Sequence, residues 1–117
     1  AFPASEGMQL RDFCHVDDVA AGLLQAAQVP EAHGEVINLA SGEPVSIREM
    51  VEKVCRLTGT GQPEFGKIAN RPGENMALYA DIKKARRLLD WNPTVSLETG
   101  LSDLIEWGRH QGWANDS

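Results

Sequence analysis

The stretch Arg11-Asp-Phe-Cys-His-Val-Asp-Asp-Val-Ala20 decides the fold, because it changes from an extended pattern to a helical one. Alternate side chains on a strand share a face, so Arg11 is expected to lie with Phe13. A helix is predicted from Asp17 to just before Pro30, since apolar residues recur there at helical spacing and acids stand at the positive end of the helix dipole. The sequence therefore places an arginine on an extended segment directly before a helix.

Further helices and strands follow from capping residues, apolar spacing and turn residues. Three more helices are predicted, beginning at Ser46, Asp81 and Ser96 and ending near Gly59, Trp91 and Gly108. Short strands are predicted over Val36–Leu39 and Glu64–Ile68, and residues 70–75 are predicted to form a loop. The fold class is α/β, an α+β-like small domain of about four helices with short strands. It lacks the long apolar strands of a doubly wound sheet and hence the Rossmann nucleotide-binding half.

The composition limits the partners and the size of the core. With 117 residues and a formal net charge of −6, the chain is predicted to be a single domain over residues 1–117, with flexible ends at 1–8 and 113–117. An acidic chain does not favour nucleic acid or anionic membrane as a partner, and no stretch is apolar enough to span a bilayer. Cys14 and Cys55 stand far apart among apolar neighbours. They are predicted to be buried free thiols, and the protein to be cytoplasmic.

A second arginine stands in the sequence Arg71-Pro-Gly-Glu74. Proline and glycine suit the central positions of a type II turn, and the residue before proline is held extended, so Arg71 projects from a rigid loop. A guanidinium held in this way can bind a phosphate through two parallel hydrogen bonds. The alternatives are a plain surface turn at Arg71 and a surface salt bridge at Arg11. For Asp12, an internal hydrogen bond or ion pair is favoured over a catalytic role.

Other patterns point to chemistry less strongly. His15 with Asp17 or Asp18 could serve a hydrolase as metal ligand or general base, but acids at a helix start are explained by the helix dipole. Tyr79 and Lys83 have the Tyr-x-x-x-Lys spacing, yet the tyrosine is predicted to lie before the helix, so the two need not share a face. The Gly59–Gly61 pair fails to continue into a phosphate-binding fingerprint.

Taken in order, five segments resemble the C-terminal part of the extended short-chain dehydrogenase/reductases, the NAD(P)-dependent epimerases, dehydratases and reductases of nucleotide sugars. These segments are Arg-Asp-Phe-Cys-His-Val-Asp-Asp-Val-Ala (11–20), Gly-Glu-Val-Ile-Asn-Leu-Ala-Ser-Gly-Glu-Pro-Val-Ser (34–46), Arg-Pro-Gly-Glu (71–74), Tyr-Ala-Asp-Ile-Lys-Lys-Ala (79–85) and Leu-Leu-Asp-Trp-Asn-Pro (88–93). The resemblance extends from about Leu10 to Trp107.

The resemblance implies a substrate-binding role without catalysis by this chain alone. Arg11 and Arg71 would neutralise the diphosphate of a nucleoside diphosphate sugar, and Glu74 would accept a hydrogen bond from a ribose hydroxyl. The cofactor, NAD or NADP, and the catalytic tyrosine and lysine are expected on an N-terminal Rossmann domain. The segment Val36–Ser41 would lie beside that domain, and the residues near His15 would seat the first helix against it.

Two interpretations remain open for the chain as a whole. The first is the substrate-binding domain of an epimerase, dehydratase or ketoreductase, present as a fragment. The second is a stand-alone module that binds a diphosphate ligand or docks on a separate Rossmann-domain partner. A homo-oligomer is compatible with either. A large exposed apolar patch would favour a fragment or a docking module.

Overall fold

The computed structural model describes residues 1–112, and the predicted flexible segment 113–117 lies outside them. Within residues 1–112 the α-helices are α1 (Val16–Gln28), α2 (Ile47–Thr58), α3 (Lys83–Leu89) and α4 (Leu97–His110), with a short 3-10 turn, η1 (Pro30–Ala32). The strands are β1 (Phe2–Pro3), β2 (Leu10–Asp12), β3 (Pro44–Ser46), β4 (Pro63–Glu64) and β5 (Ala77–Leu78). The mixed α/β fold with four helices is as predicted.

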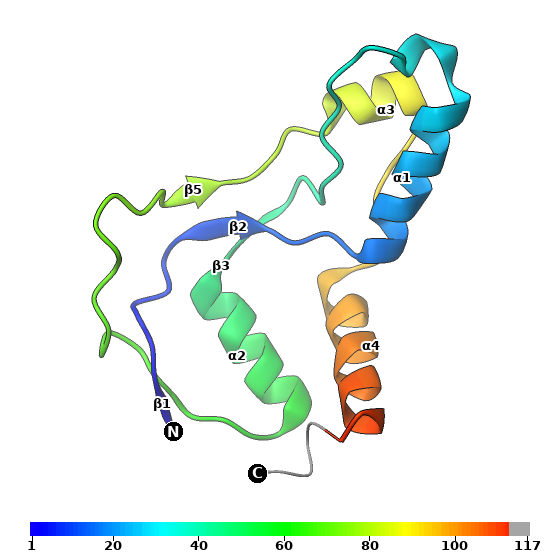
Figure 1. The fold of residues 1–117 in the computed structure, drawn as a ribbon. Coiled ribbons are helices and arrows are strands. Elements are labelled where there is room, and N and C mark those ends of the chain that lie inside the picture. The colour runs from blue at the N-terminus through cyan, green and yellow to red at the C-terminus, as the bar shows by residue number, and fades with distance from the viewer. Residues whose placement is uncertain (113–117) are drawn as a thin grey trace.

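The strand β2 is the centre of a three-stranded sheet. It pairs antiparallel with β3, where Arg11 lies opposite Val45, and parallel with β5, where Arg11 lies opposite Leu78. At the start of the chain, β1 pairs in parallel with β4. Figure 1 shows α1 and α3 together at one end of the molecule and α2 and α4 at the other. The residue Arg11 is therefore fixed between two neighbouring strands.

Two of the four predicted helix starts, at Ser46 and Ser96, are confirmed as caps, whereas α3 begins at Lys83, two residues after the predicted start at Asp81, whose carboxylate accepts from the Lys83 amide at 2.9 Å. The hydroxyl oxygen of Ser46 accepts a hydrogen bond from the Glu49 amide at 3.1 Å, and that of Ser96 accepts one from the Thr99 amide at 3.1 Å. At the start of α1 the cap is His15, whose Nδ1 accepts from the Asp17 amide at 3.0 Å. This helix begins at Val16, one residue before the predicted start, because the imidazole takes the place of a carboxylate or hydroxyl cap.

Both predicted strands are wrong in position. The segment Val36–Leu39 is not in a strand, and the strand of that region is β3, which begins five residues later at Pro44. Only Glu64 of the second predicted strand is in β4. A β-branched run predicts an extended chain, but a strand also needs a hydrogen-bonding neighbour. No strand of residues 1–112 is placed beside Val36–Leu39.

The core is small and lies between α1 and α3. Its buried apolar side chains are Ala32, Ala40, Ile82, Ala85, Leu89 and Trp91. Ala85 and Leu89 of α3, with Ile82 just before it, supply half of this core, whereas the apolar face of α2 is only half-buried. The Cα radius of gyration is 17.0 Å, against about 13 Å for a compact chain of this length. The chain is thus more open than an independent globular domain.

An apolar stripe on α1 contributes to this openness. Leu23 and Leu24 are 61% and 65% exposed. Val16, about two helical turns earlier, is also exposed. Ala20 and Ala27 continue the same helical spacing and are also exposed.

No helix among residues 1–112 combines the length and the apolar character needed to cross a bilayer.

Candidate anion-binding site

The three predicted substrate-binding residues, Arg11, Arg71 and Glu74, lie together in the structure. Nη2 of Arg11 donates to Oε1 of Glu74 at 3.1 Å, and Nε of Arg71 lies 3.3 Å from Oε2 of the same carboxylate. The Glu74 side chain is only 12% exposed, that of Arg11 is 23% exposed, and that of Arg71 is 87% exposed. One largely buried carboxylate therefore lies against two guanidinium groups, and the three formal charges sum to +1.

The loop that carries Arg71 and Glu74 has the predicted turn. The Glu74 amide donates to the Arg71 carbonyl at 3.1 Å, and Gly73 has a φ of 76°, a conformation that favours glycine. The turn brings its first and last residues close together, so both side chains reach the same place. Beyond the turn, the Met76 carbonyl accepts from the Leu10 amide at 2.8 Å. This bond ties the loop to β2, one residue before Arg11.

Asp12 has the internal role that was predicted for it. Its two carboxylate oxygens accept hydrogen bonds from the backbone amides of Ser41, at 2.7 Å, and Gly42, at 2.9 Å. The carboxylate is thereby occupied by the chain itself. Asp12 joins the end of the segment Val36–Ala40 to the strand that carries Arg11.

The hydrolase interpretation of His15, Asp17 and Asp18 finds no support in the geometry. The imidazole Nδ1 caps α1, and the Asp18 carboxylate accepts from the amides of Thr94 and Val95 and from the Thr94 hydroxyl, all within 3.0 Å. Both groups thus have structural hydrogen bonds. Within residues 1–112, no three His, Cys, Asp or Glu side chains are placed to hold a metal ion.

The structural role of Asp18 is a feature that the sequence patterns did not reveal. Burial by itself would raise the pKa of its carboxyl group, but the hydrogen bonds from Val95 and Thr94 outweigh burial and lower the pKa below its usual value. A signal was present in the spacing, because Asp18 lies one turn before Gly22, on the helix face that is buried. An acid on that face requires hydrogen-bond donors.

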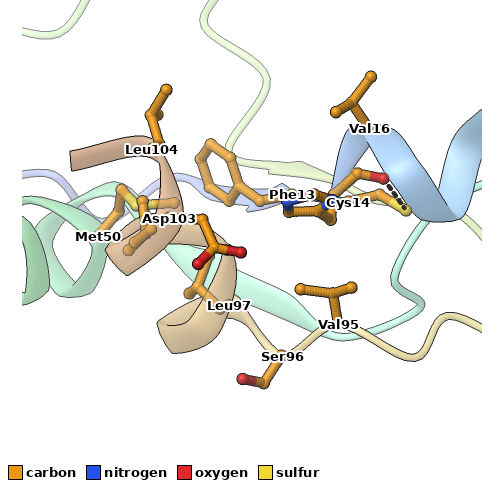
Figure 2. Close-up of a pocket in the computed structure, with 12 residues that line it drawn as sticks. Phe13, Cys14, Val16, Met50, Val95, Ser96, Leu97, Asp103 and Leu104 are labelled. Atoms are coloured by element: carbon orange, nitrogen blue, oxygen red, sulfur yellow. Dashed lines mark hydrogen bonds between the residues drawn. The ribbon is translucent and has the colours of Figure 1, made fainter. Parts of the chain in front are cut away.

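A cavity of about 450 Å³ is lined in part by Phe13, two residues after Arg11, and by none of the three site residues. Figure 2 shows Met50 of α2 and Leu97 and Leu104 of α4 around the Phe13 ring. Cys14 also lines this cavity. Burial raises the pKa of its thiol, and the Asp18 and Asp12 carboxylates raise the pKa further by smaller amounts. Cys14 is therefore a protonated thiol at neutral pH, and both cysteines are free and half-buried. The apolar lining does not suit a phosphate.

Neither the Gly59–Gly61 pair nor Tyr79 with Lys83 stands in the structural setting of the motif that it resembles. Gly59 ends α2 as a left-handed cap with a φ of 72°, whereas a dinucleotide-binding turn leads from a strand into a helix. Tyr79 is exposed and precedes α3, which begins at Lys83. This agrees with the prediction that the tyrosine lies before the helix.

Comparisons with known proteins place these features in a family. The sequence model described as GDP-mannose 4,6 dehydratase matches residues 3–104. A UDP-glucuronate 4-epimerase of Thermodesulfobacterium geofontis is 36% identical over 111 residues, which cover 89% of this chain and 32% of that protein. The chain therefore spans about a third of the length of the curated relatives that it matches.

Solved structures agree with the sequence matches. An epimerase from Methanothermobacter thermautotrophicus has a TM-score of 0.84 and 32% identity, covering 98% of this chain and 35% of that one. UDP-glucuronic acid 4-epimerase from Bacillus cereus, in complex with UDP-glucuronic acid and NAD, has a TM-score of 0.80 and 32% identity, covering 93% and 36%. The chain thus belongs to the nucleotide-sugar epimerase and dehydratase family of the extended short-chain dehydrogenase/reductases.

Proposed function

We propose that this chain is the substrate-binding part of an NAD(P)-dependent nucleotide-sugar epimerase, dehydratase or ketoreductase, and that Arg11 and Arg71 hold the diphosphate of the sugar nucleotide. The observation that carries the proposal is the convergence of two arginines, from β2 and from a distant loop, on the Glu74 carboxylate. Guanidinium groups bind phosphate through charge-assisted hydrogen bonds. A solved relative that binds UDP-glucuronic acid and NAD supports this class of ligand.

The exposed apolar surface supports a second part of the proposal, that the chain docks on a dinucleotide-binding domain. The surface that this domain would cover consists of the stripe on α1 and the segment Val36–Leu39, in which Val36 is 83% exposed. The occupant is argued from length, because the curated relatives are about three times longer than this chain. NAD or NADP on that domain would supply hydride transfer, while the residues of this chain would hold and orient the sugar nucleotide.

The arginines are tested by NMR titration of the chain with UDP-glucose, a method that measures weak binding. We expect the amide signals of Arg11, Arg71 and Glu74 to shift. Arg11→Ala and Arg71→Ala should each weaken binding roughly tenfold or more, since each removes a hydrogen bond to a charged group.

The matched control is Arg56→Ala, which removes an exposed arginine of α2 that is paired with Glu98. It should leave the affinity unchanged. Unchanged affinity in both Arg11→Ala and Arg71→Ala, or the absence of any shift at the site, would contradict the assignment of the diphosphate to these arginines. Tight binding by the chain alone would favour a stand-alone binding module over a part that needs its partner domain.

A further inference from the structure

Glu74 has contacts that a simple ligand-binding carboxylate does not need. Each of its two oxygens lies against a different arginine, at 3.1 Å from Nη2 of Arg11 and 3.3 Å from Nε of Arg71. The carboxylate is also the least exposed member of the three. Glu74 is thus the internal counter-ion of both guanidinium groups in the absence of a ligand.

The backbone fixes the carboxylate between the arginines from two directions. The turn holds Glu74 three residues from Arg71, with the Glu74 amide on the Arg71 carbonyl. The sheet holds the end of the same loop against β2, since Arg11 lies opposite Leu78 in the β2 and β5 register. The position of Glu74 therefore follows from the fold and does not depend on a ligand.

Each guanidinium keeps hydrogen-bond donors for a ligand. Arg11 uses Nη2 for Glu74 and Nη1 for the Leu10 carbonyl, at 2.7 Å, which are two of the five N–H donors of a guanidinium. Arg71 approaches Glu74 through Nε, while its side chain is 87% exposed. The pairing with Glu74 orients both side chains without exhausting their donors.

We infer that Glu74 is a positioning residue that aligns Arg11 and Arg71 in advance, so that a diphosphate, which can contact both arginines, is preferred over a single phosphate. A ligand that contacts both arginines gains from their alignment, because less side-chain freedom is lost on binding. A single phosphate on one arginine gains less from this alignment. This inference rests on the proposed function, in which the arginines bind the diphosphate.

The test compares inorganic pyrophosphate with inorganic phosphate as probes, because neither contains a ribose that Glu74 could contact. In Glu74→Gln we expect the ratio of pyrophosphate affinity to phosphate affinity to fall roughly tenfold, from the freedom regained by two side chains. Glu74→Asp keeps the charge but shortens the reach. It should lower the ratio without strengthening phosphate binding. Glu106→Gln, in α4, removes the same charge elsewhere and should leave the ratio unchanged.

A second readout needs no ligand. The Nη–H signals of Arg11 and the Nε–H signal of Arg71 in the free chain should exchange faster with water in Glu74→Gln than in the wild type, because these are the groups that lie against the Glu74 carboxylate. Unchanged ratios together with unchanged exchange in the two Glu74 variants would overturn the positioning role and leave the proposed function standing. Failure of the wild-type chain to bind pyrophosphate would overturn both.

Discussion

At the scale of single residues, Asp18 joins the first and the last helix of the chain. Its carboxylate accepts three hydrogen bonds from Thr94 and Val95, directly before α4, and its backbone carbonyl accepts one from Nε1 of Trp91 at 2.9 Å. The residue is 4% exposed. Since α1 follows the strand that carries Arg11, Asp18 stabilises the framework on which the site is built.

Asp18→Asn should lower the free energy of unfolding by about 2 kcal/mol at pH 7, because it weakens hydrogen bonds to a buried charged group. The pKa of Asp18 is lowered in the folded chain, so its contribution is present above the ordinary pKa of an aspartate and is lost as the pH falls through the folded value. Urea unfolding at pH 7 and near pH 3 should therefore show a smaller difference between wild type and variant at the lower pH.

The control for this experiment is Asp17→Asn, since Asp17 is an exposed acid at the same helix start. Its effect should be about 0.5 kcal/mol, the size of a helix-dipole contribution. An equal loss for Asp17→Asn and Asp18→Asn, or a loss for Asp18→Asn that does not change with pH, would contradict the role given to Asp18.

The residues of the candidate site could be selected from the sequence, but their contacts could not. Turn residues around Arg71 and an extended pattern around Arg11 predict where each side chain projects. The pairing of Arg11 with Glu74 joins positions 63 apart, and local spacing carries no information about it. The internal role of Asp12 was predictable, because a carboxylate among apolar neighbours requires donors.

At the scale of elements, α1 is packed against the segment that follows it. A Cβ atom on Gly22 would lie 2.7 Å from both Cδ atoms of Leu39 and 3.1 Å from Nε1 of Trp91. Leu39 and Ile37 are half-buried against the core, while Val36 points to solvent. The small size of Gly22 therefore allows Val36–Leu39 to lie close to the helix.

Gly22→Ala should destabilise the chain by about 1–3 kcal/mol, because an added methyl group overfills this contact, although alanine is the better helix former. Thermal unfolding would measure the change. In the double variant Gly22→Ala with Leu39→Ala the two losses should be less than additive, since the smaller side chain leaves room for the methyl group. Full additivity, or a Gly22→Ala variant more stable than the wild type, would rule out this packing as the reason for glycine.

Helices were predicted better than strands for a physical reason. Caps such as Ser46 and Ser96 act within one turn, so short stretches of sequence contain the necessary information. A strand depends on a neighbour that lies elsewhere in the chain or in another domain. Val36–Leu39 has the composition of a strand but is irregular, because residues 1–112 supply no strand beside it.

At the scale of the whole molecule, the chain exposes more surface than its mass requires. The accessible surface is 7950 Å², whereas a compact monomer of 12.8 kDa exposes about 6,300 Å². The apolar stripe of α1 forms part of this surface. Such exposure is typical of a surface that another domain or chain covers.

Leu23→Lys with Leu24→Lys should therefore reduce association between copies of the chain while changing its stability by no more than about 0.5 kcal/mol, since both side chains are already exposed. Sedimentation at several concentrations would measure the association. Gln28→Lys with Glu31→Gln adds the same charge near the end of α1 and should leave association unchanged. A large loss of stability in the leucine variant would mean that the stripe is part of the core and not a docking surface.

The central claim is that Arg11 and Arg71 bind the diphosphate of a sugar nucleotide. The most direct measurement is a crystal structure of the chain with bound UDP-glucose. The account predicts phosphate oxygens within about 3.2 Å of guanidinium nitrogens of both arginines, with Glu74 still between them. A diphosphate bound elsewhere, with neither guanidinium in contact with it, would contradict the claim.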